Sequence, residues 1–449
     1  MSGLGEKLPL IAILPFAGIL LSISLFPLIA PRFWHSHYGK VSLFWALLSS
    51  GPLLYFFPEE ALHKILHVLM AEYIPFILLL SALYVVSGNI YLQTNFSGTP
   101  LFNTAYLLTG TFLASLMGTT GASIVLIRPL LRANAWRKNK AYIIIFFIFL
   151  VSNIGGALTP LGDPPLFLGF LKGVPFFWTL NLLPSMLICV AFLLGLFYFI
   201  DTLNFKKEKK LFSEATKKRP FLLLGWYNIF LLTGIPLTIL LSANFHLPRI
   251  NLLGIERPLQ EVLRDLIFVL LAGLSFYLTP QEVREKNEFT LFPIKEVALL
   301  FFGIFIAMIP AISILQAGEK GVLKPLIITL KDPDHYFWVT GILSAFLDNA
   351  PTYLTFLSTC LGGFYPGIPE KEAVVHLIQE HPKYLLAISE GAVFFGALTY
   401  IGNAPNFMVR SIAEEKGIPM PSFFGYLLKY SIPLLIPPFI LLTLIFYRG

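Results

Sequence analysis

The sequence predicts an all-α polytopic membrane protein made of two inverted-topology repeats, each containing a re-entrant hairpin and a discontinuous helix. Three observations favour this fold class. The chain is 56% hydrophobic and 13% charged, and its mean hydropathy is +0.76, values typical of membrane proteins. Nearly the same phrase occurs twice, as GALTPLGDPP at 156–165 and GALTYIGNAP at 396–405. Both phrases interrupt runs that are otherwise apolar enough to cross a bilayer.

Apolar runs close to the ~20 residues that span a hydrocarbon core predict about 10–11 transmembrane helices. They lie near 9–30, 40–57, 73–92, 141–170, 175–201, 220–243, 261–278, 294–315, 384–412 and 422–446. The first run lacks the basic flank and small-residue cleavage site of a signal peptide, so we expect it to be a retained helix.

Two further segments, 101–131 and 335–363, are apolar but have polar tips with Gly or Pro at their centres. Each is too long for one comfortable helix and therefore predicts a re-entrant hairpin. Basic residues gather in the loops around 132–140 and 202–219, which the positive-inside rule places in the cytoplasm. With both loops inside, the first hairpin must open toward the cytoplasm and the second toward the outside. Opposite orientation of matching elements indicates inverted repeats.

The predicted organisation divides the chain at the basic linker. Residues 1–72 and 220–293 are expected to be scaffold helices, 73–201 and 294–449 the two repeats, and 202–219 a solvated cytoplasmic loop. Gly118 matches Asp348 at an offset of 230 residues, and Gly156 matches Gly396 at an offset of 240. Two matches in the same order at nearly one offset favour an internal duplication. We expect an integral protein of a bacterial-type inner membrane.

Proline explains why the two phrases predict broken helices. Pro164 has no amide hydrogen and leaves the carbonyl of Pro160 without a helical partner, and Pro405 does the same to Ile401. Such carbonyls cannot face lipid, so they face protein, water or an ion. A half-helix that begins after a break offers its N-terminus to an anion, and one that ends before it offers carbonyls to a cation.

Asp163 and Asp348 are the acidic candidates for a binding site, because a carboxylate at membrane depth usually lies on an ion or proton path. Either could instead be a helix cap. The other candidate ion- or substrate-binding residues supply hydroxyl, amide or backbone groups: Thr119, Thr120, Ser123, Asn153, Gly156, Thr159, Asn349, Thr352, Thr399, Asn403 and Asn406. Because sodium prefers oxygen ligands, Asp163, Asp348 and Asn349 are its expected ligands.

Several function classes are disfavoured by what the sequence lacks. The chain has no P-loop, Rossmann glycine run, nucleophile elbow or zinc-protease motif, so we expect neither ATP-driven transport nor an enzyme. Cys189 and Cys360 lie in apolar surroundings and predict neither a disulfide framework nor a thiolate metal site. The net charge of +7 gathers in connecting loops and indicates topology rather than nucleic-acid binding. No cofactor is expected, only sodium ions and protons as transported or coupling ions.

Three segments resemble the ion-transporter superfamily, which includes D-type sodium/proton antiporters, arsenite efflux pumps, and citrate and dicarboxylate transporters. Residues 152–165 are similar to its first broken-helix motif, 344–351 to the antiporter and arsenite-pump hairpin, and 401–406 to its second break. The resemblance covers about 70–447. It implies a scaffold and a mobile transport domain that moves as an elevator, often in homodimers.

The resemblance also implies cation sites where each hairpin tip meets the neighbouring broken helix. Thr119 and Thr120 would then face the segment from Asn153 to Asp163. Asp348 and Asn349 would face Thr399 and Asn403. The first tip departs from the family pattern, because Gly-Thr-Thr stands where many relatives carry an acid or Ser with Asn.

An acid at the second tip would repel a dianion, so the main expectation is a sodium/proton antiporter working by alternating access. Sodium and protons would compete for Asp348 and Asp163. The alternative is a sodium- or proton-coupled citrate or dicarboxylate transporter, in which Thr119, Thr120, Asn349 and Thr352 bind the anion. A third possibility is a membrane scaffold or sensor that binds without turnover. Expected partners are thus a small inorganic cation or small carboxylate and the lipid bilayer.

Overall fold

The computed structural model describes residues 3–93, 97–215, 222–245 and 247–448. Helices dominate these residues, and the described strands form only two short antiparallel ribbons. In one, β1 (Tyr91–Gln93) pairs with β2 (Leu222–Leu224); in the other, β3 (Arg249–Leu252) pairs with β4 (Ile255–Pro258). The prediction of an all-α polytopic membrane protein is confirmed.

The first half of the chain places its helices where the apolar runs predict them. The N-terminal helices are α1 (Gly3–Lys7), η1 (Leu10–Ile13), α2 (Leu14–Ile29), α3 (Pro31–Phe56), and α4 (Pro58–His67), which continues through the π-helical η2 (Val68–Tyr73) into α5 (Ile74–Gly88). The first hairpin consists of α6 (Pro100–Met117) and α7 (Thr119–Ala133). The first broken helix is α8 (Ala141–Leu150), η3 (Ile154–Leu158) and α9 (Pro164–Leu171), followed by η4 (Phe176–Leu182) and α10 (Leu183–Ala215).

The second half repeats this order. It starts with α11 (Asn228–Asn244), α12 (Leu259–Leu278), α13 (Gln281–Lys286), α14 (Phe292–Ala307), α15 (Ile309–Gln316), η5 (Gly318–Lys320) and α16 (Lys324–Thr329). The second hairpin is α17 (Pro333–Phe346) with α18 (Asn349–Phe364), and α19 (Glu370–Glu380) follows it. The second broken helix is α20 (Pro382–Phe395), η6 (Gly396–Leu398) and α21 (Ala404–Glu415). The chain ends with α22 (Phe423–Tyr426), η7 (Leu427–Ser431), α23 (Ile432–Leu442) and η8 (Thr443–Tyr447).

Both predicted breaks are present, and the sequence explains them locally. Asp163 and Asn403 have extended backbones, with ψ angles of 141° and 140°, immediately before Pro164 and Ala404 open α9 and α21. Pro164 disfavours the helical conformation of Asp163, which precedes it, and both Pro164 and Pro405 are well placed in the first turns of α9 and α21. The positions at which the second half-helices begin therefore follow from the duplicated phrase.

By length and apolar composition alone, five segments of the described chain could cross a bilayer, or six if the bent pair α14–α15 is one span. The five segments are Leu10–Pro27, Pro58–Gly88, Ala141–Leu158, Phe176–Glu208 and Phe423–Tyr447. The other predicted spans are also helical, but they are interrupted, as in α20 and α21, or short, as in α11, or carry three charged residues, as in α12, or are less apolar, as in α3. These segments are helical, as predicted, but they do not meet the criterion of length and apolar composition.

The linker 202–219 was predicted to be a solvated loop, and this is wrong for its described part. Helix α10 continues through it to Ala215, while 216–219 lie outside the described residues. Lys and Glu, which dominate this stretch, are good helix formers. They extend an existing helix at little cost.

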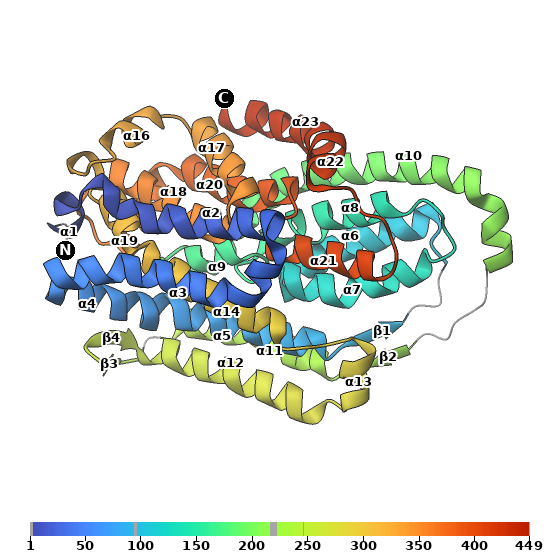
Figure 1. The fold of residues 1–449 in the computed structure, drawn as a ribbon, viewed down its shortest axis with the longest axis horizontal. Coiled ribbons are helices and arrows are strands. Elements are labelled where there is room, and N and C mark those ends of the chain that lie inside the picture. Colours follow the sequence, from blue (N-terminus) through green and yellow to red (C-terminus); the bar gives the residue numbers. More distant parts are fainter. Residues whose placement is uncertain (1–2, 94–96, 216–221, 246, 449) are drawn as a thin grey trace.

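Helices of the two halves form two layers (Figure 1). We call residues 100–215 and 333–447 the hairpin layer, since they contain both hairpins and both broken helices. Residues 14–88 and 228–307 form the scaffold layer, in which α14 packs on α3 and α12 packs on α5. In Figure 1, α3, α4, α5 and α12 lie below α6, α8, α17 and α18. The layers meet where α5 packs against α7.

Candidate functional site

The tips of the two hairpins meet the two helix breaks at a single buried carboxylate, Asp163. Thr119 Oγ1 and Asn403 Nδ2 donate to Asp163 Oδ1 at 3.0 and 2.9 Å, and Asn349 Nδ2 donates to Oδ2 at 2.6 Å. All four residues are at most 3% exposed. Segments separated by up to 284 residues in sequence, from 119 to 403, thus contribute to one polar cluster.

The four residues form two pairs related by the internal duplication. Asn349 follows Thr119 by 230 residues, and Asn403 follows Asp163 by 240, the two offsets found for the repeated phrases. In each pair the two partners come from equivalent places: a hairpin tip for one pair and the residue before a half-helix for the other. The cluster therefore lies where the two repeats face each other, which is where such folds bind their substrates.

The hairpin tips reach this position because the backbone turns sharply at each tip. Gly118 has φ 79° between α6 and α7, a conformation that glycine adopts without steric cost. The amide of Thr119 then donates to the carbonyl of Gly162 at 2.8 Å, which fastens the first tip to the first break. In the second tip the chain turns through Leu347 and Asp348, both with extended backbone.

A second set of amides joins the two breaks to each other. Asn153 Nδ2 donates to Asn406 Oδ1 at 2.7 Å, and Asn403 Nδ2 lies 3.3 Å from Asn153 Oδ1. Asn406 Nδ2 donates to the carbonyls of Gly396 and Thr399, which the second break leaves without helical partners. These bonds therefore hold Asn403, a member of the central cluster, and the freed carbonyls of the second break in place.

Thr159 and Thr399 are anchors rather than central residues. Thr159 Oγ1 donates to the carbonyl of Ser115, and Thr399 Oγ1 donates to the carbonyl of Ala345. These two bonds are equivalent under the offsets of 230 and 240. Each ties a break to the end of the incoming hairpin arm and so fixes the distance between tip and break.

The remaining predicted residues have diverse places. Ser123 Oγ lies 2.8 Å from Ser152 Oγ inside the hairpin layer. Gly156 packs so closely that a Cβ there would lie 2.7 Å from Thr119 Cγ2. Thr120 is half-buried and lines the cavity described below.

Asp348 is a helix cap in this structure. Its Oδ1 accepts from the amide of Ala350 at 3.1 Å, and its carbonyl accepts from Thr352 Oγ1 at 2.9 Å. The capping alternative therefore describes the side chain of Asp348, whereas Asp163 makes no capping bond to its own helix. The neighbouring Asn349 contacts Asp163 at the centre of the cluster. The sequence predicted that both Asp348 and Asn349 would lie there.

Four half-helices begin at this cluster: α7 at Thr119, α9 at Pro164, α18 at Asn349 and α21 at Ala404. Each N-terminus carries a partial positive charge of about half an elementary charge. Together they stabilise a buried carboxylate that is not neutralised by a described ion pair. Rotation of the Asn349 and Asn403 amides and of the Thr119 hydroxyl would present oxygens, so the same side chains can also surround a cation.

A cavity of about 90 Å³ opens beside the cluster, between the first hairpin tip and the scaffold layer. The hairpin layer contributes Thr119, Thr120, Gly162, Pro164, Ala404 and Met408, and the scaffold layer Leu80, Leu83, Tyr84, Ile294 and Val297. The cavity has room for only a few water molecules. Because the cavity lies between the two layers, movement of one layer relative to the other would enlarge it.

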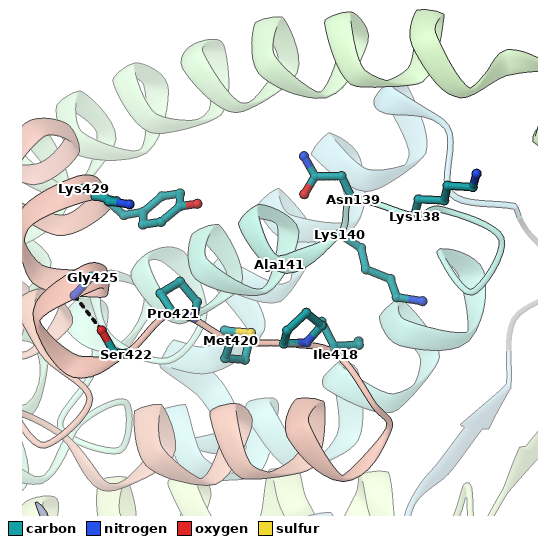
Figure 2. A pocket seen from close by; sticks show the side chains of 12 residues that line it. Lys138, Asn139, Lys140, Ala141, Ile418, Met420, Pro421, Ser422, Gly425 and Lys429 are labelled. Atoms are coloured by element: carbon teal, nitrogen blue, oxygen red, sulfur yellow. Dashed lines mark hydrogen bonds between the residues drawn. The ribbon is translucent and has the colours of Figure 1, made fainter.

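A larger cavity, of about 400 Å³, lies elsewhere and includes Lys138, Lys140 and Lys429 in its lining. Figure 2 shows the side chains of Lys138 and Lys140 directed away from Lys429, and Lys140 Nζ lies 3.4 Å from the carbonyl of Ala135. Because the ammonium groups do not converge, this recess does not have the geometry of an anion site.

Two serines that sequence reasoning missed complete the first break. Ser115 Oγ donates to the carbonyl of Gly155 at 2.5 Å and accepts from the amide of Leu158 at 3.1 Å. Ser152 pairs with Ser123 and offers its carbonyl to Asn403 at 3.2 Å. Ser115 lies three residues before Gly118, so a search of the arm that leads to the predicted tip would have found it.

These features define a polytopic membrane protein of inverted repeats, with its polar site at the crossing of two hairpins and two broken helices. The chain belongs to the CitMHS_2 family, described as "Putative citrate transport", whose model matches residues 5–447. It is therefore a member of a secondary transporter family, in agreement with the resemblance of its motifs. This description agrees better with carboxylate transport than with sodium/proton exchange. A search of the curated proteins finds no match.

Proposed function

We propose that this protein is a secondary transporter that carries a small di- or tricarboxylate and couples its movement to sodium ions or protons bound at Asp163. The observation that carries the proposal is the meeting of four half-helix N-termini at one buried site. Helix N-termini attract anions through a favourable dipole, which is present here although Pro164, Pro165 and Pro405 carry no amide hydrogen. The family description supports the same substrate class.

The charges at the site favour a di- or tricarboxylate more strongly when a cation is bound as well. Four N-termini contribute roughly two positive charges, and Asp163 removes one of them. A substrate carboxylate about 5 Å from Asp163 would meet a repulsion of about 3 kcal/mol at an effective dielectric constant of about 20. A sodium ion or proton on Asp163 removes this repulsion. Substrate and cation would therefore bind together, which is the requirement for coupled transport.

Sodium/proton exchange is the second candidate, and one observation favours it. Asp163 is the single charged side chain among the four residues of the central cluster, and the adjoining cavity of about 90 Å³ admits only a few waters. A site of this size suits a bare cation in the present conformation. Carboxylate transport requires the layers to separate before the substrate enters.

Proteoliposomes that contain a pH-sensitive dye separate the two candidates. Uptake of labelled citrate, succinate and malate is measured under a sodium gradient, a proton gradient and neither, and the dye reports protons moved by sodium, lithium or potassium alone. Saturable, gradient-dependent uptake of a carboxylate supports the proposal. A dye response to sodium without any carboxylate uptake refutes it and supports exchange.

A further inference from the structure

Two clusters of ion pairs connect the hairpin layer to the scaffold layer outside the site. In the first, Lys172 Nζ lies 2.8 Å from Glu72 Oε1 and 2.8 Å from Glu370 Oε2. Glu72 belongs to η2 of the scaffold layer, whereas Lys172 follows α9 and Glu370 opens α19 of the hairpin layer. The Lys172 and Glu72 side chains are only 10% and 7% exposed.

In the second cluster one carboxylate lies between two cations, whereas in the first one cation lies between two carboxylates. Glu288 of the scaffold layer has its Oε1 3.0 Å from Lys416 Nζ and its Oε2 3.1 Å from Arg128 Nη2. Lys416 follows α21, and Arg128 belongs to α7. The Glu288 and Lys416 side chains are 43% and 46% exposed. One scaffold carboxylate thus bridges two cations of the hairpin layer.

The two clusters occupy equivalent places in the two repeats. Lys172 is the C-cap of α9, and Lys416 is the C-cap of α21, the second half of each broken helix. Glu72 comes two residues before α5, which leads to the first hairpin, and Glu288 comes four residues before α14, which begins the scaffold segment ahead of the second hairpin. Inverted repeats place equivalent features on opposite sides. Accordingly, α4 and α19 lie at the left end of the molecule and α13 in its right half (Figure 1).

The backbone of Glu288 closes the C-terminus of α13. Its φ is 51°, a left-handed conformation that is common just after a helix end. The amides of Glu288 and Phe289 donate to the carbonyls of Glu285 and Arg284, each at 2.9 Å. This helix end is the backbone from which the Glu288 side chain reaches the two cations of the opposite layer.

We propose that these two clusters are equivalent ionic latches that fasten the hairpin layer to the scaffold at its two ends. The site opens toward one side when the latch at that end separates. The proposal rests on the proposed function only in requiring that the layers move. It assigns Glu72, Lys172, Glu288 and Lys416 to conformational control rather than to binding.

The latches differ in strength, and this sets the order of opening. The Glu288 latch is half-exposed, so water and salt weaken its attraction. The Lys172 latch is buried, and separating it would leave Lys172 paired with Glu370 but would take Glu72 from its lysine in a poorly solvated place. At the Lys172 end, Lys371 and Glu261 add a further contact between the layers at 3.5 Å. The Glu288 end therefore opens first.

A cysteine reporter on the scaffold face of the small cavity tests this without any substrate. Val297 lines the cavity from α14, and Cys189 and Cys360 are buried and can be replaced by serine. We measure the rate at which a maleimide labels Val297→Cys with and without Glu288→Gln. An exposed ion pair of up to ~1 kcal/mol predicts labelling about two- to fivefold faster. Lys416→Gln should also accelerate labelling, but by less, because Arg128 still pairs with Glu288.

Glu414→Gln is the matched control, because Glu414 pairs with Arg410 within α21 and spans no interface. It should leave the labelling rate unchanged. Glu72→Gln should also leave the rate unchanged, because it acts at the other end. Equal labelling in the Glu288→Gln and Glu414→Gln proteins, each of which elutes as a folded species, overturns the proposal. If carboxylate uptake is absent but labelling accelerates, the proposed function fails and the latches stand.

Discussion

Replacing Asp163 by Asn is the most informative perturbation of the site. The change keeps the size of the side chain but removes the charge that a coupling cation would bind. Asp163 is 1% exposed, so its attraction for a cation at ~4 Å is about 4 kcal/mol at an effective dielectric constant of about 20. In water the same attraction is only about 1 kcal/mol. Burial therefore predicts a loss of cation affinity of about a thousandfold, rather than about fivefold.

The measurement is the sodium or proton concentration that gives half-maximal carboxylate uptake into proteoliposomes. Asp332→Asn serves as the control, because the Asp332 side chain is 66% exposed and lies outside the cluster. We expect this control to transport as the natural protein does. Thermal unfolding of both variants shows that they are folded. Uptake by a folded Asp163→Asn protein with cation dependence shifted by less than tenfold would refute the assignment of the coupling site.

Three further predictions concern the packing and the latch. Thr399→Val removes the donor to the carbonyl of Ala345 and should destabilise the protein by about 1–3 kcal/mol, seen as a lower Tm, because a buried acceptor loses its partner. Gly162→Ala should abolish folded expression, since its Cβ would lie 2.1 Å from the carbonyl oxygen of Gly156; normal yield would contradict this. Partial burial raises the pKa of Glu288, but hydrogen bonds and charge from Lys416 and Arg128 outweigh it, so this pKa lies below its ordinary value. A carboxyl with a depressed pKa stabilises above its unfolded pKa of about 4 and loses this effect as the pH falls through the folded pKa. Glu288→Gln should therefore accelerate labelling equally at pH 6 and pH 8, and a strong difference between them would argue against the ion pair.

The sequence alone determined the class of fold and the positions of the two broken helices and the first hairpin tip. Composition required a membrane protein, and proline and glycine have local effects on the backbone that do not depend on distant partners. Pro164 and Pro405 therefore predicted both breaks correctly, and Gly118 predicted the first hairpin tip. The loop expected at 202–215 failed for a related reason, because helix propensity acts locally and outweighed the polar composition of that stretch.

Only the tertiary structure decided which polar side chains meet. Asp163 and Asp348 are both acids before a half-helix in the sequence, yet one is the centre of the cluster and the other caps α18. The bonds of Asp163 to Asn349 and Asn403 join residues 186 and 240 positions apart. No local preference encodes such distances. They are set by how the two repeats pack face to face, and the same packing brings Lys172 and Lys416 to carboxylates of the scaffold.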